Sequence, residues 1–183
     1  MRWVLFALPL VALLTGDLPA LARAPLVEAE AALKSLRYKE AISLSEQVLA
    51  SKEAGPAEVT AAYRIMGWSM AVTGRDDDAV LAFRCLLSLD PAFRLGKGVS
   101  PKIRTSFYQA AGMAMDAKPL ALSHVPPEAE DRLGGMKVRV SLVADPMSLV
   151  KGLRFRYLLP GGETREMTVL VTGPRKVSFK LPD

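Results

Sequence analysis

The chain has 183 residues, a formal net charge of +5, one cysteine and one histidine. A single cysteine excludes an internal disulfide framework, and a single histidine excludes metal sites built on two imidazoles. Hydrophobic residues make up 50% of the chain, which is typical of a globular protein, and the mild positive charge alone does not indicate nucleic acid binding.

Residues 1–24 have the pattern of a secretory signal peptide. Arg2 precedes an apolar run over residues 3–14, and small residues suited to cleavage follow at Ala20, Ala22 and Ala24. The run is shorter than the roughly 20 residues that span a bilayer, so we expect cleavage, with an uncleaved anchor as the alternative. No cysteine follows the run, so no lipid attachment is expected. We predict an exported protein, periplasmic or extracellular.

Two helices are predicted next. Apolar residues spaced along one face indicate a helix from Pro25 to Arg37 and a second one over residues 38–49. A polar loop containing a Gly-Pro pair follows over residues 50–56. The second helix opens near Ala41, and an alanine recurs 38 residues later at Ala79.

Residues 63–91 predict a closely packed pair of helices. Gly67 and Ala79 are small, so two helices can approach there, and bulky residues would fill the surrounding space: Tyr63, Met66, Met70, Leu81, Phe83 and Leu87. Gly74 suits a left-handed end of the first helix. The three aspartates at residues 76–78 are expected to cap the second helix and to complement its dipole, and Pro91 ends it.

These residues resemble one tetratricopeptide repeat. Its pattern of W-x2-L-G-x2-Y, A-x3-F and P is matched at Tyr63, Met66, Gly67, Met70, Ala79, Phe83 and Pro91. Residues 25–49 resemble a weaker copy with Ala29 and Ser45 in the places of Gly67 and Phe83, and a longer loop costs little. Residues 38–117 also resemble exported repeat proteins of myxobacteria and their relatives. The resemblance implies about two helical hairpins that hold other proteins.

A further helix is predicted from Ser100-Pro101 to residue 117, because a hydroxyl residue followed by proline is typical of a helix start. It would cap the exposed end of the array, giving a helical domain over residues 25–118. A basic cluster with no acid between its members surrounds this start: Arg94, Lys97, Lys102 and Arg104. The cluster could contact an anionic surface such as lipid headgroups or an acidic protein, and a merely solvated helix start is the alternative.

The remainder predicts a β segment over residues 136–183, after a linker at 119–135. Alternating apolar residues indicate four short strands, near residues 138–142, 153–157, 167–171 and 177–181. They resemble the front half of an immunoglobulin-like domain, which needs about seven strands. The segment is therefore either incomplete or a small antiparallel sheet packed on the helices. The expected fold class is α+β.

The resemblance also indicates where a partner would bind. It places Ala61, Arg64, Trp68 and Ala71 on the helix face that lines the concave binding surface of tetratricopeptide proteins. Trp and Arg are enriched among residues that dominate binding energy, so we expect Arg64 and Trp68 to contact a partner. The alternative is that neighbouring helices or the β segment cover Trp68.

The sequence predicts no catalysis, metal or cofactor. His124 lies in the expected linker without a partner for general-base work, and Gly96-Lys97-Gly98 lacks the spacing of a phosphate loop. Cys85 is expected to be a buried core residue. We predict a non-catalytic scaffold of the bacterial cell envelope that binds a protein and no nucleic acid, with membrane-surface contact and self-association left open. In the alternative, the β segment recognises cell-wall sugar or lipid and the helices support it.

Overall fold

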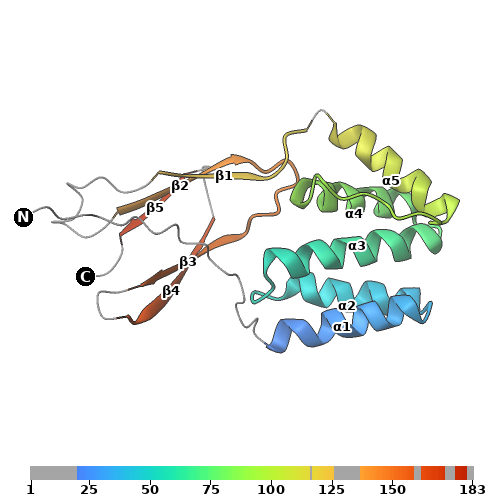
Figure 1. Ribbon diagram of the computed structural model, residues 1–183, viewed down its shortest axis with the longest axis horizontal. Coiled ribbons are helices and arrows are strands. Elements are labelled where there is room, and N and C mark those ends of the chain that lie inside the picture. Colours follow the sequence, from blue (N-terminus) through green and yellow to red (C-terminus); the bar gives the residue numbers. More distant parts are fainter. Residues whose placement is uncertain (1–19, 116, 126–136, 159–161, 172–175, 181–183) are drawn as a thin grey trace, which may run out of the picture.

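The computed structural model describes residues 20–115, 117–125, 137–158, 162–171 and 176–180 (Figure 1). The helices are α1 (Ala20–Lys34), α2 (Tyr38–Ala50), α3 (Pro56–Val72), α4 (Asp76–Leu89) and α5 (Pro101–Ala114). The strands are β1 (Ala121–Val125), β2 (Lys137–Ala144), β3 (Gly152–Leu158), β4 (Thr164–Leu170) and β5 (Lys176–Lys180). The expected α+β class is confirmed. The predicted signal segment lies outside the described residues, except for residues 20–24, which belong to α1.

The five helices lie side by side in sequence order as one stack, and the strands lie to the left of this stack, beyond one set of helix ends (Figure 1). Each helix packs against the next along the chain, and α3 also contacts both α1 and α5. Helix α3 is therefore the central element of the stack. No helix in the described part of the chain is both long enough and apolar enough to cross a membrane.

Two turns end their helices in the same way. After α1, the Arg37 N–H donates to the Ala32 carbonyl at 2.8 Å, and after α3 the Arg75 N–H donates to the Met70 carbonyl at 2.9 Å. This helix-ending hydrogen bond requires a residue with left-handed backbone geometry just before the N–H donor. Gly74 supplies it after α3 with φ 79°, as the sequence predicted, but Leu36 supplies it after α1 with φ 59°. A side chain in that region costs about 1 kcal/mol or more.

The helix starts differ in detail from the sequence prediction. Helix α4 begins at Asp76 as expected, but no side chain caps its first backbone amides. The Asp78 carboxylate instead accepts from Arg75 Nε at 2.8 Å. Ser100 precedes α5, yet its hydroxyl makes no capping bond, and α5 ends at Ala114 instead of residue 117. The acidic first turn of α4 still complements the helix dipole.

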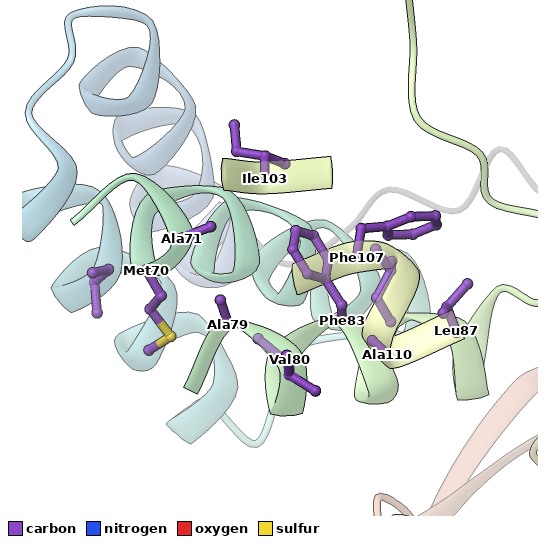
Figure 2. Packing of buried hydrophobic residues seen from close by; sticks show 12 residues of the cluster. Met70, Ala71, Ala79, Val80, Phe83, Leu87, Ile103, Phe107 and Ala110 are labelled. Atoms are coloured by element: carbon purple, nitrogen blue, oxygen red, sulfur yellow. The ribbon is translucent and has the colours of Figure 1, made fainter. Parts of the chain in front are cut away.

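The main core lies between α3, α4 and α5 (Figure 2). Phe83 on α4 is fully buried, and a Cβ added at Gly67 on α3 would lie 2.6 Å from its ring. The predicted close approach of these two helices is therefore confirmed. The Phe83 ring meets the Phe107 ring of α5 edge to face, with centroids 5.4 Å apart. A smaller cluster joins α1, α2 and α3 through Ala29, Ala32, Ala41 and Ile65.

The strands form two antiparallel sheets, one ordered β1-β2-β5 and the other a β3–β4 hairpin. All four predicted strands are present, and the expected linker is wrong over residues 121–125, which form β1. His124 consequently lies opposite Val140 of β2. Residues 121–125 read Ala-Leu-Ser-His-Val without regular alternation, so the strand depends on pairing with β2 and not on a two-sided pattern. The immunoglobulin-like resemblance remains a prediction.

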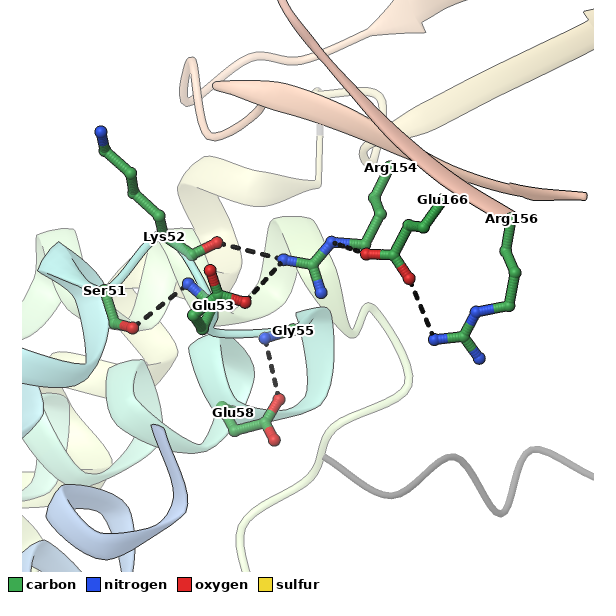
Figure 3. A network of polar contacts seen from close by, with 8 residues as sticks. All are labelled: Ser51, Lys52, Glu53, Gly55, Glu58, Arg154, Arg156 and Glu166. Carbon is green, nitrogen blue, oxygen red and sulfur yellow. Dashed lines mark hydrogen bonds and ion pairs between the residues drawn. The ribbon is translucent and has the colours of Figure 1, made fainter. Parts of the chain in front are cut away.

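One arginine joins the hairpin to the helices (Figure 3). Arg154 of β3 donates to the Lys52 carbonyl at 3.2 Å and pairs with Glu53 at 3.4 Å, both in the loop between α2 and α3. Its Nε also pairs with Glu166 of β4 at 3.2 Å, and Glu166 binds Arg156 at 3.2 Å. The long loop between α2 and α3 thus provides the surface on which the hairpin docks.

The Gly67–Phe83 contact predicts a sharp difference between two helical glycines. Gly67→Ala should destabilise the protein by about 2 kcal/mol, because the methyl group overlaps the buried ring. Gly112→Ala on α5 should stabilise it by about 0.5–1 kcal/mol, because nothing lies within 4 Å and alanine favours helices. Urea unfolding followed by circular dichroism measures both changes. Equal effects of the two substitutions would contradict the packing.

The Arg154 contacts predict a local change with little effect on global stability, since exposed ion pairs contribute at most about 1 kcal/mol. Arg154→Gln should speed amide hydrogen exchange in residues 51–55 and in β3 and β4, while the unfolding midpoint changes little. Arg165→Gln is the matched control, because Arg165 pairs with Glu163 within the hairpin. If both variants gave the same exchange pattern, the docking role of Arg154 would be wrong.

Candidate functional site

An apolar groove opens where α1 ends, α2 begins, α3 ends and α5 begins. We call it the Leu36 groove. Its volume is about 550 Å³, and its lining consists of Leu33, Leu36, Tyr38, Trp68, Val72, Ser100, Lys102 and Ile103. Seven of these eight residues carry no charge, so the groove suits an apolar group with one cation at its edge.

Trp68 forms part of the groove wall. It is half-buried, and its ring meets the Phe83 ring edge to face, with centroids 6.4 Å apart. The core therefore fixes the orientation of the indole. An aromatic side chain held in this way loses little further entropy when a ligand packs against it. Trp68 thus lines the groove and also packs on Phe83, and its contact with a partner stays a prediction.

Leu36 is the most unusual residue of the groove. Its side chain is 68% exposed, and its backbone is left-handed. The corresponding residue after α3, Gly74, satisfies the same geometry without a side chain. Glycine at residue 36 would therefore suit folding better, because it adopts this backbone geometry without strain. The leucine introduces backbone strain and adds exposed apolar surface at the groove.

The other residues predicted to bind a partner lie elsewhere. Arg64 pairs with Glu30 of α1 at 3.0 Å, so its guanidinium joins α3 to α1. Ala61 is half-buried and does not line the groove. Ala71 has no exposed surface and packs in the main core, which corrects its assignment as a contact residue.

The predicted basic cluster divides between different surfaces. Lys102 lines the Leu36 groove, whereas Arg94 lines a separate cavity beside the C-terminal ends of α4 and α5. The Arg94 side chain donates to the carbonyls of Pro91 and Phe93 at 2.9 and 2.7 Å. Lys97 and Arg104 are exposed and line neither space.

Buried Cys85 and half-buried Tyr63 form a hydrogen-bonded pair in the α3–α4 interface. Burial raises the pKa of the Tyr63 hydroxyl to about 12, and its hydrogen bond to Cys85 adds to the effect. Burial also raises the pKa of the Cys85 thiol, against smaller opposing effects from Tyr63 and from the charge of Arg84. Cys85 is buried, as predicted. The neutral forms of both groups are favoured, so the pair is poorly suited to nucleophilic chemistry.

Metal binding finds no support among the described residues, where His, Cys, Asp and Glu side chains form no group of three that could hold an ion. His124 is exposed on β1.

Sequence reasoning missed most of the groove. The unrecognised lining residues come from four helix ends, those of α1, α2, α3 and α5: Leu33, Leu36, Tyr38, Val72 and Ile103. One signal was available, because Leu36 precedes Gly74 by the same 38 residues that separate Ala41 from Ala79. A leucine at a position where the second hairpin uses a left-handed glycine could have marked residue 36 as unusual.

The chain matches no protein-family model, and comparisons with curated proteins and with solved structures gave no match. The assignment of function therefore depends on the geometry of the chain itself.

The raised pKa of Tyr63 predicts that the free energy of unfolding decreases at alkaline pH. In the unfolded chain a tyrosine ionises near pH 10, whereas folded Tyr63 does so near 12, so stability falls as the pH rises from about 10 towards 12. Tyr63→Phe should reduce this fall, measured as the difference in unfolding free energy between pH 9 and 11.5. The exposed Tyr108→Phe is the control and should leave it unchanged. An identical fall in the wild type and the Tyr63 variant would refute the assignment.

Proposed function

We propose that the chain is a non-catalytic scaffold that holds a protein partner in the Leu36 groove, on tetratricopeptide-like helices exported to the bacterial cell envelope. The observation that carries this proposal is Leu36, a strained and exposed leucine beside an ordered tryptophan in an apolar groove.

The helix arrangement supports the repeat-like part of the proposal. Helix α3 contacts α1 and α5 as well as its chain neighbours, as expected where helical hairpins stack. Both helix pairs meet at small residues: Ala29 and Ala41 are buried in the first pair, and Gly67 and Ala79 in the second. The residues of each pair are separated by 38 positions from their counterparts, so one register relates the two hairpins.

The strain at Leu36 supports a role in binding. Exposed apolar side chains are common on proteins and alone need no explanation. This leucine, however, stands where glycine would relieve backbone strain, and it extends a groove whose other walls are apolar. Strained residues of this kind cluster at ligand-binding positions. A partner that covers Leu36 would gain the burial energy that the free protein does not realise.

The groove also indicates the chemistry of the partner. An apolar side chain would fit between Trp68, Val72 and Ile103, and Lys102 at the edge would favour a carboxylate beside it. We therefore propose a partner segment with a large apolar residue flanked by an acid. No enzyme activity is needed for this function.

The envelope location in this proposal is supported by residues 1–24 alone. Their basic start, apolar run and small residues match a signal peptide.

Leu36→Gly should separate binding from folding. Glycine suits φ 59°, so the variant should be as stable as the wild type or up to about 1 kcal/mol more stable. We expect it to lose the partner because the groove loses its exposed apolar wall. The measurement is in-cell photo-crosslinking from a probe residue at position 100, where the exposed Ser100 lines the groove and makes no capping bond, followed by mass spectrometry, in chains with and without Leu36→Gly.

Leu81→Gly would be a poor control, because it places glycine inside α4. Leu81→Ser instead removes an exposed leucine outside the groove and should leave the crosslinked partner unchanged. The proposal fails if Leu36→Gly keeps the same crosslinked protein at the same yield, or if Leu81→Ser loses it equally.

A further inference from the structure

A second space lies where the helices meet the β segment, independent of the Leu36 groove. We call it the junction cavity. Its volume is about 300 Å³, and its walls come from the C-terminal parts of α4 and α5 and from the turn after β2. Phe107, Leu87 and Ala111 supply apolar surface beside three methionines, Met113, Met115 and Met147. Methionines are flexible and polarizable, so such walls adapt to apolar ligands of varied shape.

Three cations also line the junction cavity: Arg84, Arg94 and Lys118. No Asp or Glu is among the described residues that line it. Two acids next to its lining are among the described residues, and both are engaged by backbone amides; Asp116, between the lining residues Met115 and Ala117 in the sequence, lies outside the described residues. The Asp90 carboxylate accepts from the Ala92 N–H at 3.1 Å, and that of Asp145 accepts from the Leu149 and Val150 N–H groups at 2.8 and 3.0 Å.

The three cations keep hydrogen-bond donors available for a ligand. None of the three takes part in an ion pair within the described part of the chain. Arg94 uses one guanidinium nitrogen for two backbone carbonyls, which leaves its other N–H groups for a ligand. Among the described residues, the cavity therefore combines an apolar interior with three cations that no described acid pairs.

Ser88 provides a separate observation at the same place. It lines the junction cavity, only 7% of its surface is exposed, and its Oγ has no hydrogen-bond partner among the described residues. A buried hydroxyl without a partner costs about 1–3 kcal/mol. A ligand that enters deeply enough to reach this Oγ, which has less than 1 Å² of accessible surface, would remove that cost by accepting from it.

The ends of α4 and α5 oppose an anion to some degree, since helix C-termini carry partial negative charge. Several of their last carbonyls are satisfied, because the Leu120 N–H donates to Ser88 at 3.0 Å and the Ala117 N–H donates to Ala114 at 3.1 Å. Half a charge per helix end is smaller than the three full charges of the cations. The charges of the described residues around the cavity thus favour an anionic headgroup.

We infer that the junction cavity binds a single-chain anionic amphiphile, with its acyl tail among the methionines and its carboxylate or phosphate headgroup between Arg84, Arg94 and Lys118. A tail of medium length suits the volume, which is at the lower end of the range for small-molecule sites. This ligand site is separate from the protein-binding groove and does not depend on it.

The test uses the full chain with 13C-labelled methionine methyl groups, titrated below the micelle concentration with decanoate, decyl phosphate, decanol and acetate. We expect decanoate or decyl phosphate to shift the Met113, Met115 and Met147 signals, and the tighter of the two identifies the headgroup. Decanol should bind at least about fivefold more weakly because it lacks the anionic headgroup. Acetate should produce no shift because it lacks the long apolar tail.

Substitutions of single residues then test which cations bind the headgroup. Arg84→Gln and Lys118→Gln should each weaken binding of the better amphiphile about fivefold. Lys102→Gln, which removes a cation from the Leu36 groove, is the matched control and should not change it. Ala111→Leu should fill the cavity and abolish the methyl shifts, while circular dichroism verifies the fold. The inference is overturned if neither anion shifts these methyls, if decanol binds as tightly, or if all three charge variants behave alike.

Discussion

The close contact between Gly67 and Phe83 determines how the helices pack. No side chain fits between α3 and the Phe83 ring, so the two helices lie as close as their backbones and this ring allow. Because α3 also contacts α1 and α5, its position relative to α4 sets the geometry of the whole stack. The Leu36 groove is formed by the ends of α1 and α3 and the starts of α2 and α5, so its shape depends on how these helices pack around α3.

The same ring also connects the two candidate sites. Phe83 meets both Trp68 of the groove and Phe107 of the junction cavity, and Phe107 in turn meets Tyr108 with centroids 5.7 Å apart. Both sites thus lie against one aromatic cluster. Substitution of Phe83 would alter both together and could not assign a role to either. Residues at the periphery, such as Leu36 and Lys118, can be changed without opening the core.

The sequence was informative where one residue type dictates one geometry. Gly67 beside a bulky residue predicted the helix contact, Gly74 predicted the left-handed turn, and alternating residues predicted four strands. The sequence was less informative where the residues in contact come from segments far apart in the chain. Strand β1 forms through pairing with β2, and Arg154 reaches a loop about a hundred residues earlier. The Leu36 groove was likewise missed because its walls are helix ends brought together only by the stack.

The two helical hairpins place different residues at positions related by the same 38-residue spacing. In the second, Gly67 accepts the Phe83 ring and Gly74 ends the helix without strain. In the first, the position of Phe83 is taken by Ser45, whose hydroxyl is satisfied by the Ala41 carbonyl at 2.8 Å. This pair of helices therefore meets through small residues and builds no aromatic core. Its distinctive large side chain, Leu36, is instead exposed at the groove, where it contributes surface that the folded chain itself does not bury.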